Sequence, residues 1–390
     1  MQQIPFVKPT IGGEETQHLE ASIKLGQLCG GGDYSLRCSE QIAGLTGCRY
    51  NRLVSSCSSG LDAICLALDL MPGDEVIMPS FTFPSTANAV ALRGGVPVFV
   101  DIRPDTMNID EEKIEAAITG RTKAIIIVHY AGVSCAMDRI IEIAGKYNLY
   151  LIEDAAQAVG AYYKNRHLGT LGDFAAFSFH ATKNINCGEG GAVLVNRPGY
   201  FQTLCMIIEK GTNREAFRQK LVNKYQWQSL GSSYVLSELQ ASFLYSQLLR
   251  ADELTAQRLQ KWAYYYDRLY PFNGQGFRLA EIPSDCQHNG HIFYVHLDNR
   301  QARSEVMACL SSQGIQTTTH FEPLHLSPAG KEYCRASAEL TQTNELAASL
   351  LRLPLWNDIS ESQQDYVVEQ FLSAIPSGQD RVLPKNIISN

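Results

Sequence analysis

A carboxylate and an amine follow two apolar runs of the sequence that have the length of buried strands. Asp154 comes directly after the run 149–153, and Lys183 follows the run 174–179 by four residues. In open α/β sheets, side chains just beyond the carboxyl ends of the strands face the ligand crevice. Asp154 and Lys183 are 29 residues apart, about the length of one crossover, so we expect both in one cleft.

This pair suits the chemistry of pyridoxal phosphate (PLP). A lysine amine forms an imine with the cofactor's aldehyde, and once displaced it is a free base that can carry a proton. A carboxylate beside the pyridinium nitrogen keeps that nitrogen protonated, so that the ring accepts the electrons left when a Cα–H bond breaks. The cofactor's phosphate needs N–H groups and hydroxyls at a helix N-terminus, and the serine-rich stretch 55–60 precedes an expected helix.

Each of these features alone has a common structural explanation. A single lysine is usually a solvated surface residue, Asp154 alone could cap a helix, and the serine run could be a polar loop. A further segment, 188–191, contains three glycines and begins the next expected strand. The combination of these segments favours a PLP site over the separate explanations.

The elements that must position these residues alternate between strands and helices. Strands are expected at 75–78, 96–101, 124–130, 149–153, 174–179 and 192–195. Helices are expected at 59–70, 85–93, 111–117 and 137–147. Several strands are apolar at almost every position, as in strands covered on both faces. The alternation predicts an α/β fold built from βαβ units with a largely parallel sheet.

The pattern changes after residue 234. One or two long helices are expected over 237–270, followed by a strand at 291–297 and helices at 303–313 and 361–373. We therefore expect a large PLP-binding domain over 1–250 and a small α+β C-terminal domain over 251–390. The tail 377–390 has no apolar face and is expected to be loosely held.

Composition excludes several classes of function. The 33 Lys and Arg against 40 Asp and Glu give a net charge of −7, which offers no electrostatic footprint for nucleic acid. No apolar run is long enough to cross a bilayer, and the start has no signal-peptide pattern, so no membrane contact is expected. Eleven Cys without a CxxC motif indicate buried thiols in a reduced, cytoplasmic enzyme.

Other common phosphate-binding and metal-binding motifs are absent from the sequence. No GxGxxG follows a strand, and neither GxxxxGK[ST] nor HExxH occurs. The closest pair of histidines, His288 and His291, is expected to be structural or exposed, and no metal is predicted.

Three segments resemble the PLP-dependent sugar aminotransferases of the DegT/DnrJ/StrS family: 154–157, 178–183 and 189–191. The resemblance extends from Ile4 to about Ser373. It implies the fold-type I aminotransferase architecture, with a large domain around a seven-stranded mixed sheet and a smaller C-terminal domain. It also implies a homodimer with active sites at the subunit interface.

The resemblance assigns roles around the cofactor. It makes Lys183 the Schiff-base lysine and Asp154 the partner of the pyridinium nitrogen, and it places Gln157 beside the phenolic oxygen. The implied phosphate ligands are Ser58, Ser59 and Ser178.

Other assignments concern the ring and the substrate. Phe83 matches an aromatic residue stacked on the cofactor, although a core residue is the alternative. His320 and His325 match a family segment near the substrate, and Asn213 and Arg214 are placed near it by likeness.

A narrower likeness involves the segments 73–83, 103–110, 210–214 and 231–234. They resemble the branch of the family that transfers an amino group from L-glutamate to C4 of dTDP-4-keto-6-deoxyglucose. The implied product is dTDP-4-amino-4,6-dideoxygalactose (dTDP-fucosamine), used in enterobacterial common antigen or lipopolysaccharide biosynthesis.

The chain departs from that branch at two places. The segment 184–188 is one residue shorter, as in the wider family. Ser233 stands where many members have an Asn that reaches the partner subunit's phosphate, and its hydroxyl or that of Ser232 is a candidate substitute.

Three other functions remain as alternatives. The same reaction could give the 4-amino-4,6-dideoxyglucose epimer. A PLP-dependent nucleotide-sugar dehydratase would have histidine in place of Lys183. A non-enzymatic relative would have lost some of the residues Asp154, Gln157, Ser178 and Lys183, and all four are present.

Overall fold

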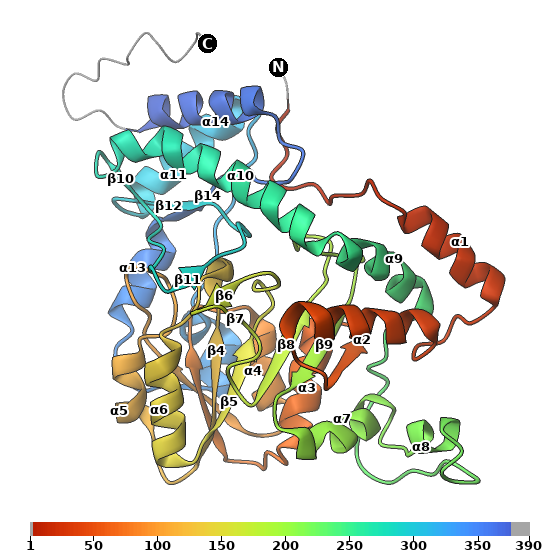
Figure 1. Cartoon of the computed structure of the whole chain (residues 1–390). Helices are drawn as coiled ribbons and strands as arrows, with labels where there is room; N and C mark the ends of the chain where they lie inside the picture. The colour runs from red at the N-terminus through yellow and green to blue at the C-terminus, as the bar shows by residue number, and fades with distance from the viewer. Residues whose placement is uncertain (1–2, 376–390) are drawn as a thin grey trace.

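A large sheet of eight strands positions the carboxylate and the amine (Figure 1). The computed structural model describes residues 3–375, so the tail 377–390 lies outside the described residues. The strands are β1 (Asn51–Val54), β2 (Glu75–Pro79), β3 (Val96–Val100), β4 (Thr122–Val128), β5 (Tyr150–Asp154), β8 (Phe174–Ser178), β9 (Gly191–Val195) and β13 (Arg335–Ala336). Their order is β1-β9-β8-β5-β4-β2-β3-β13, and β9 runs antiparallel to both of its neighbours.

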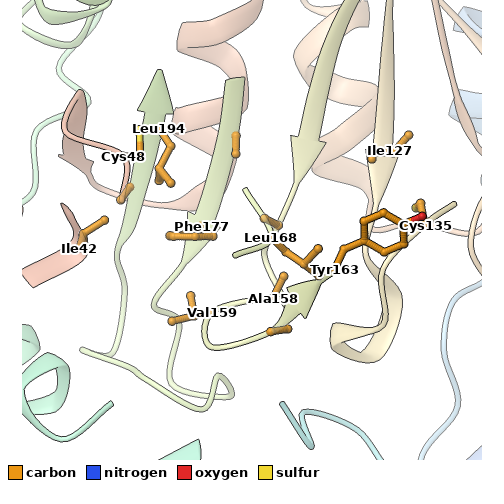
Figure 2. Close-up of a cluster of buried hydrophobic side chains, with 14 of the residues drawn as sticks. Ile42, Cys48, Ile127, Cys135, Ala158, Val159, Tyr163, Leu168, Phe177 and Leu194 are labelled. Atoms are coloured by element: carbon orange, nitrogen blue, oxygen red, sulfur yellow. The ribbon is translucent and has the colours of Figure 1, made fainter. Parts of the chain in front are cut away.

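The strands are apolar on both faces because helices cover both sides of the sheet. In β4, Ala124 and Ile126 belong to one buried cluster, whereas Ile125 and Ile127 belong to the other. This alternation follows from the two-residue period of a strand. Figure 2 shows the cluster that contains Ile127, in which Phe177 of β8 and Leu194 of β9 lie on the same side of the sheet.

Two sets of helices form these layers. Helices α2 (Asp33–Thr46), α6 (Met137–Tyr147) and α9 (Glu238–Leu249) contribute to the cluster with Ile127. Helices α3 (Cys57–Ala67), α4 (Pro84–Ala91) and α7 (Phe201–Ile208) contribute to the cluster with Ile126. A sheet with helices on both faces is the expected α/β architecture.

A second core lies around the small antiparallel sheet β10-β12-β14 (Figure 1). Its strands are β10 (Phe277–Leu279), β12 (Tyr294–Leu297) and β14 (Leu350–Arg352). Helices α10 (Ala251–Leu269), α11 (Arg300–Ser312) and α14 (Glu361–Ala374) pack on it. Ile4, from the other end of the chain, is buried in the same cluster.

The remaining α-helices and strands of the described residues are short or peripheral. They are α1 (Glu15–Leu25), α5 (Ile114–Ala117), α8 (Arg214–Arg218), α12 (Pro328–Tyr333), α13 (Thr341–Ser349), β6 (Tyr162–Tyr163), β7 (Arg166–His167) and β11 (Cys286–Gln287). Strands β11, β6 and β7 form a third small sheet. None of the helices in the described part of the chain combines the length and apolar character required to span a bilayer.

The α/β fold expected from the sequence is confirmed, and the six strands expected before residue 200 are present with shifts of one or two residues at their ends. The strand expected at 291–297 is β12, which begins three residues later. Seven strands of the large sheet come from the first 195 residues, as the resemblance implied. The eighth, β13, is a two-residue strand that pairs with β3. Of the one or two long helices expected over 237–270, the structure has two, since the backbone breaks at Arg250 with φ −111° and ψ 17°. The division of the chain into two domains at residue 250 stays a prediction.

Candidate active site

A cavity of about 500 Å³ lies beyond the carboxyl ends of the central strands, and the second core forms part of its wall. Seven of the residues singled out from the sequence line it: Ser58, Phe83, Asp154, Gln157, Ser178, Lys183 and His320.

The large sheet brings Asp154 and Lys183 together. Asp154 is the last residue of β5, and it pairs in register with Ala176 of the neighbouring parallel strand β8. Lys183 follows β8 in a tight turn, in which its backbone N–H donates to the carbonyl of His180 at 2.8 Å. Two parallel neighbours end at the same edge, so both side chains reach the cavity.

Asp154 is a buried carboxylate. Thr86 Oγ1 donates to Asp154 Oδ2 at 2.7 Å, and the backbone N–H of Ala156 donates to Oδ1 at 3.2 Å. Burial raises the pKa of Asp154, and the hydrogen bond from Thr86 opposes this shift. A nearby cation that donates to the carboxylate would stabilise its charged form.

Lys183 has the properties of a nucleophilic amine. Burial lowers the pKa of Lys183 to about 8, with a contribution from the charge of Arg352 and opposition from Cys57 and Asp154. An amine with a pKa near 8 has a substantial neutral fraction at neutral pH, and the neutral form attacks carbonyl carbon.

The neighbouring carboxylate, Glu153, has a structural role. Successive residues of a strand point to opposite faces, so Glu153 points away from Asp154. It is fully buried and accepts hydrogen bonds from the backbone N–H groups of Gly169, Leu171 and Gly172. Its other partner is His129, at 2.9 Å. Only Asp154 of the acidic pair is available to a ligand.

The serine-rich stretch forms the N-terminus of α3. Ser56 caps the helix, with its hydroxyl accepting from the backbone N–H of Ser59 at 3.1 Å. Ser58 lines the cavity and shares a 2.6 Å hydrogen bond with Ser85. A Cβ on Gly191 would lie 2.6 Å from the backbone nitrogen of Cys57, so glycine lets β9 approach the start of α3. The helix terminus and Ser58 can hold an anionic phosphate.

Three other predicted cofactor residues occupy the same cavity. Gln157 Oε1 accepts from the backbone N–H of Ala131 at 2.6 Å, which orients the amide and leaves its NH₂ group as the donor for a ligand. Ser178 is buried at the end of β8. Phe83 is 60% exposed, so it is not a core residue, and its stacking on the cofactor stays a prediction.

His320 belongs to a hydrogen-bonded group at the cavity wall. Arg352 Nη1 contacts His320 Nε2, and Tyr130 Oη lies 3.2 Å from His320 Nδ1. The His320 ring stacks on Phe321 with a centroid distance of 4.2 Å. Burial lowers the pKa of His320 to about 2, with contributions from Arg352 and Lys183, so the ring is neutral.

Five predicted residues do not line this cavity. Ser59 lies beneath the turn, where its hydroxyl shares hydrogen bonds with Ser55 and Ser56 at 2.8 and 3.0 Å. His325 shares a 2.7 Å hydrogen bond with Ser80. Asn213 accepts from the backbone N–H of Gln226 at 2.7 Å, and Arg214 pairs with Glu209 at 3.2 Å. Ser233 is exposed in the same region as these last two residues and forms a β-bridge with Glu209. Their roles stay predictions.

Sequence reasoning missed several cavity residues. His291, expected to be structural or exposed, lines the cavity, and its Nδ1 shares a 2.9 Å hydrogen bond with Asn184. Arg258 and Arg352 also line it. Neither arginine lies in a recognisable motif. Each comes from the C-terminal part of the chain and reaches the cavity only through tertiary packing, so the local sequence does not reveal it.

The residues present fit pyridoxal phosphate. The cavity offers an amine of low pKa, a buried carboxylate, an oriented amide and a helix N-terminus with serine hydroxyls. These are the donors and acceptors that an aldehyde, a pyridinium nitrogen, a phenolic oxygen and a phosphate require.

Comparisons with known proteins agree with this arrangement. Residues 9–372 match the model of the DegT/DnrJ/EryC1/StrS aminotransferase family. The spore coat polysaccharide biosynthesis protein SpsC of Bacillus subtilis (strain 168) is 33% identical over 374 residues, which cover 94% of this chain and 95% of SpsC.

Two solved structures are similar along the whole fold. The aminotransferase TlmJ from Streptoalloteichus hindustanus superposes with a TM-score of 0.88 at 27% identity, covering 96% of this chain and 99% of TlmJ. DesV from S. venezuelae superposes with a TM-score of 0.86 at 29% identity, covering 97% of this chain and 100% of DesV.

Proposed function

This chain belongs to the DegT/DnrJ/EryC1/StrS aminotransferase family, and on this basis we propose that it transfers an amino group from L-glutamate to C4 of a dTDP-linked 4-keto-6-deoxy sugar. It is a PLP-dependent aminotransferase of the sugar-modifying class. The proposed products are dTDP-4-amino-4,6-dideoxygalactose and 2-oxoglutarate.

One observation carries the chemical part of the proposal: Lys183 and Asp154 line one cavity at the ends of adjacent parallel strands. When bound, pyridoxal phosphate supplies an electron sink for the carbon that loses its proton. Asp154 would hold the ring nitrogen in its protonated form. Ser58, Ser178 and the N-terminus of α3 would hold the phosphate, with Ser59 supporting the turn from below.

Lys183 is the proposed proton carrier. Its pKa of about 8 is close to neutral pH, where an amine can both accept and release a proton. In the first half of the reaction the amine would remove the Cα proton of glutamate. In the second half it would return a proton to C4 of the sugar, on the face from which it approaches. That face sets the galacto or gluco configuration of the product.

The sugar assignment is supported by likeness. SpsC is named for the biosynthesis of a polysaccharide, and the segments 73–83, 103–110, 210–214 and 231–234 resemble transaminases that act on dTDP-4-keto-6-deoxyglucose. We propose Asn213, Arg214, His320 and His325 as residues near this substrate. The 4-amino-4,6-dideoxyglucose epimer is the alternative product. A dehydratase is disfavoured because position 183 is lysine and not histidine.

We also propose that the protein is a homodimer with shared active sites and that it is located in the cytoplasm. In and after α8, which follows Asn213, five large apolar side chains are exposed, and a partner subunit would cover them: Phe217, Leu221, Tyr225, Trp227 and Leu230. The eleven cysteines are all free, which is consistent with a reducing compartment.

The direct test is incubation with dTDP-4-keto-6-deoxyglucose and L-glutamate, followed by NMR assignment of the aminated carbon and its configuration. Lys183→Ala is the inactive control, and Lys123→Ala, at an exposed position, is the matched control. Amination at C4 with an axial amine supports the proposal. An equatorial amine identifies the gluco epimer, and loss of the hydroxyl without gain of nitrogen identifies a dehydratase.

A further inference from the structure

Arg352 lines the same cavity as Lys183, and strand pairing holds its backbone in place. It is the last residue of β14, and its backbone N–H donates to the carbonyl of Thr318 at 2.8 Å. On the other side, β14 pairs with β12, where Arg352 is opposite Tyr294. A side chain carried by a strand that is paired on both sides is well positioned to recognise a ligand.

The guanidinium of Arg352 has no acidic partner among residues 3–375. Its contacts are His320 Nε2 and the ring of Phe6, whose centroid lies 4.7 Å away, and its Nε is buried without a hydrogen bond. Burial lowers the pKa of Arg352 to about 10, so it remains cationic at neutral pH. Arg103, in contrast, pairs with both Asp105 and Glu111. A sequestered guanidinium without a carboxylate is costly unless a ligand supplies the anion.

His320 orients this guanidinium. A guanidinium can only donate, so Nε2 of His320 must accept, and the proton of the neutral ring is on Nδ1. Nδ1 then donates to the Tyr130 hydroxyl oxygen, 3.2 Å away. Tyr130 is itself buried among Phe81, Tyr294 and Phe321. The hydrogen bonds from Arg352 to His320 and from His320 to Tyr130 therefore fix Nη1 of the guanidinium. Because Nε is buried, the Nη groups are the part that remains for a ligand in the cavity.

We propose that Arg352 binds the α-carboxylate of the amino donor, with His320 as the residue that positions it; this inference rests on the proposed function. In an amino acid, the carboxylate is bonded to the carbon that carries the reacting amine. Arg352 lines the same cavity as Lys183, the residue that reacts with the cofactor, and is therefore in the right region for that carboxylate. The fork of a guanidinium matches the two oxygens of a carboxylate.

The diphosphate of the sugar nucleotide is the competing anion. In a hexose, C4 lies across the ring from C1, which carries the diphosphate. When C4 is near Lys183, the diphosphate must lie several ångströms further out, toward the mouth of the cavity. Arg352 lines the same cavity as Lys183, and its charge acts on the Lys183 amine, so the donor's carboxylate fits better.

The test compares Arg352→Gln and Arg352→Lys with Arg278→Gln, an exposed arginine of the same small sheet that serves as the matched control. Each PLP-loaded protein is titrated with L-glutamate while the visible absorbance of the cofactor is followed. We expect Arg352→Gln to raise the glutamate concentration for half-response about 100-fold, Arg352→Lys less, and Arg278→Gln not at all. Ethylamine, an amine without a carboxylate, should react equally with all four proteins.

Calorimetry gives a readout that does not depend on turnover. Glutarate has two carboxylates and no amine, and its binding to the PLP-loaded protein should be lost in Arg352→Gln and kept in Arg278→Gln. The inference is overturned if Arg352→Gln and Arg352→Lys respond to glutamate like the parent protein. It is also overturned if they lose affinity only for the sugar nucleotide, measured in the second half-reaction. If the parent protein itself gives no response to glutamate, the proposed function fails, and the inference fails with it.

Discussion

Thr86 donates a 2.7 Å hydrogen bond to Asp154 across 68 residues of sequence. Thr86 is in α4, and its hydroxyl in turn shares a 2.7 Å hydrogen bond with Thr82, so Thr82 donates to Thr86 and Thr86 donates to Asp154. These two hydrogen bonds connect two segments around the buried carboxylate, and the one from Thr86 lowers the pKa of Asp154 against the rise that burial causes.

Replacing Thr86 tests the importance of this hydrogen bond. Thr86→Val keeps the shape of the side chain and removes the donor, so the pKa of Asp154 should rise further. A less ionised Asp154 holds a pyridinium nitrogen less well, and we expect PLP to bind about tenfold more weakly. The measurement is a fluorescence or absorbance titration of the cofactor-free protein with PLP. Thr86→Ser restores the donor and should restore the affinity; unchanged affinity in Thr86→Val would contradict the assigned role.

The low pKa of Lys183 predicts how PLP loading depends on pH. Only the neutral amine attacks an aldehyde, and an amine of pKa about 8 is about one-tenth neutral at pH 7. The rate of loading should rise about tenfold per pH unit below pH 8 and level off above it. Stopped-flow absorbance from pH 6 to 10 measures this profile. A rate that keeps rising to pH 10 would mean that the amine retains the pKa of an exposed lysine.

The positions of the main site residues could be predicted because the ends of buried strands can be recognised in the sequence. Asp154 comes at the end of one apolar run and Lys183 follows another, and the carboxyl ends of parallel strands lie at one edge of the sheet. The first strand, β1, was missed because Asn51 and Arg52 interrupt its apolar pattern, and β13 is too short to show a pattern.

Residues whose place in the site depends on tertiary contacts could not be predicted from the sequence. Ser58 and Ser59 are adjacent and chemically identical, and only the helix geometry shows that Ser58 lines the cavity while Ser59 supports the turn. Arg352 ends a strand of the small sheet, and nothing in its local sequence distinguishes it from a surface arginine. Its position near Lys183 depends on how the second core packs against the large sheet.

The ion pairs of the buried Glu75, at the start of β2, predict a pH-dependent contribution to stability. Glu75 accepts from Arg335, Arg121 and Thr119, and these hydrogen bonds, Arg335 first, lower the pKa of Glu75 to about 2. Because the folded-state pKa is below the ordinary value, the stabilisation is complete above about pH 4.5 and is lost as the pH falls toward 2.

Glu75→Gln should therefore lower the free energy of unfolding by about 2 kcal/mol at pH 7. Its difference from the parent protein should shrink below about pH 4.5. Urea unfolding at several pH values measures both effects, and Glu112→Gln, an exposed glutamate, is the control. A difference that does not change with pH would show that Glu75 contributes by packing and not by its charge.

The shared active site can be tested with two inactive variants. In its own subunit Arg214 pairs with Glu209 and lies outside the cavity, so a role near the substrate requires the cavity of the partner subunit. We expect Arg214→Ala and Lys183→Ala each to be inactive or nearly so as homodimers. In a mixed dimer, the Lys183 of one subunit and the Arg214 of the other complete one site.

Random reassociation of equal amounts of the two variants, after mild dissociation, should restore about a quarter of the parent activity, since half of the dimers are mixed and each has one working site. Arg218→Ala, which alters a neighbouring arginine, should be active without mixing. If the mixture stays inactive while mixed dimers are demonstrated by affinity tags, Arg214 serves its own subunit, and the site is not shared through this residue.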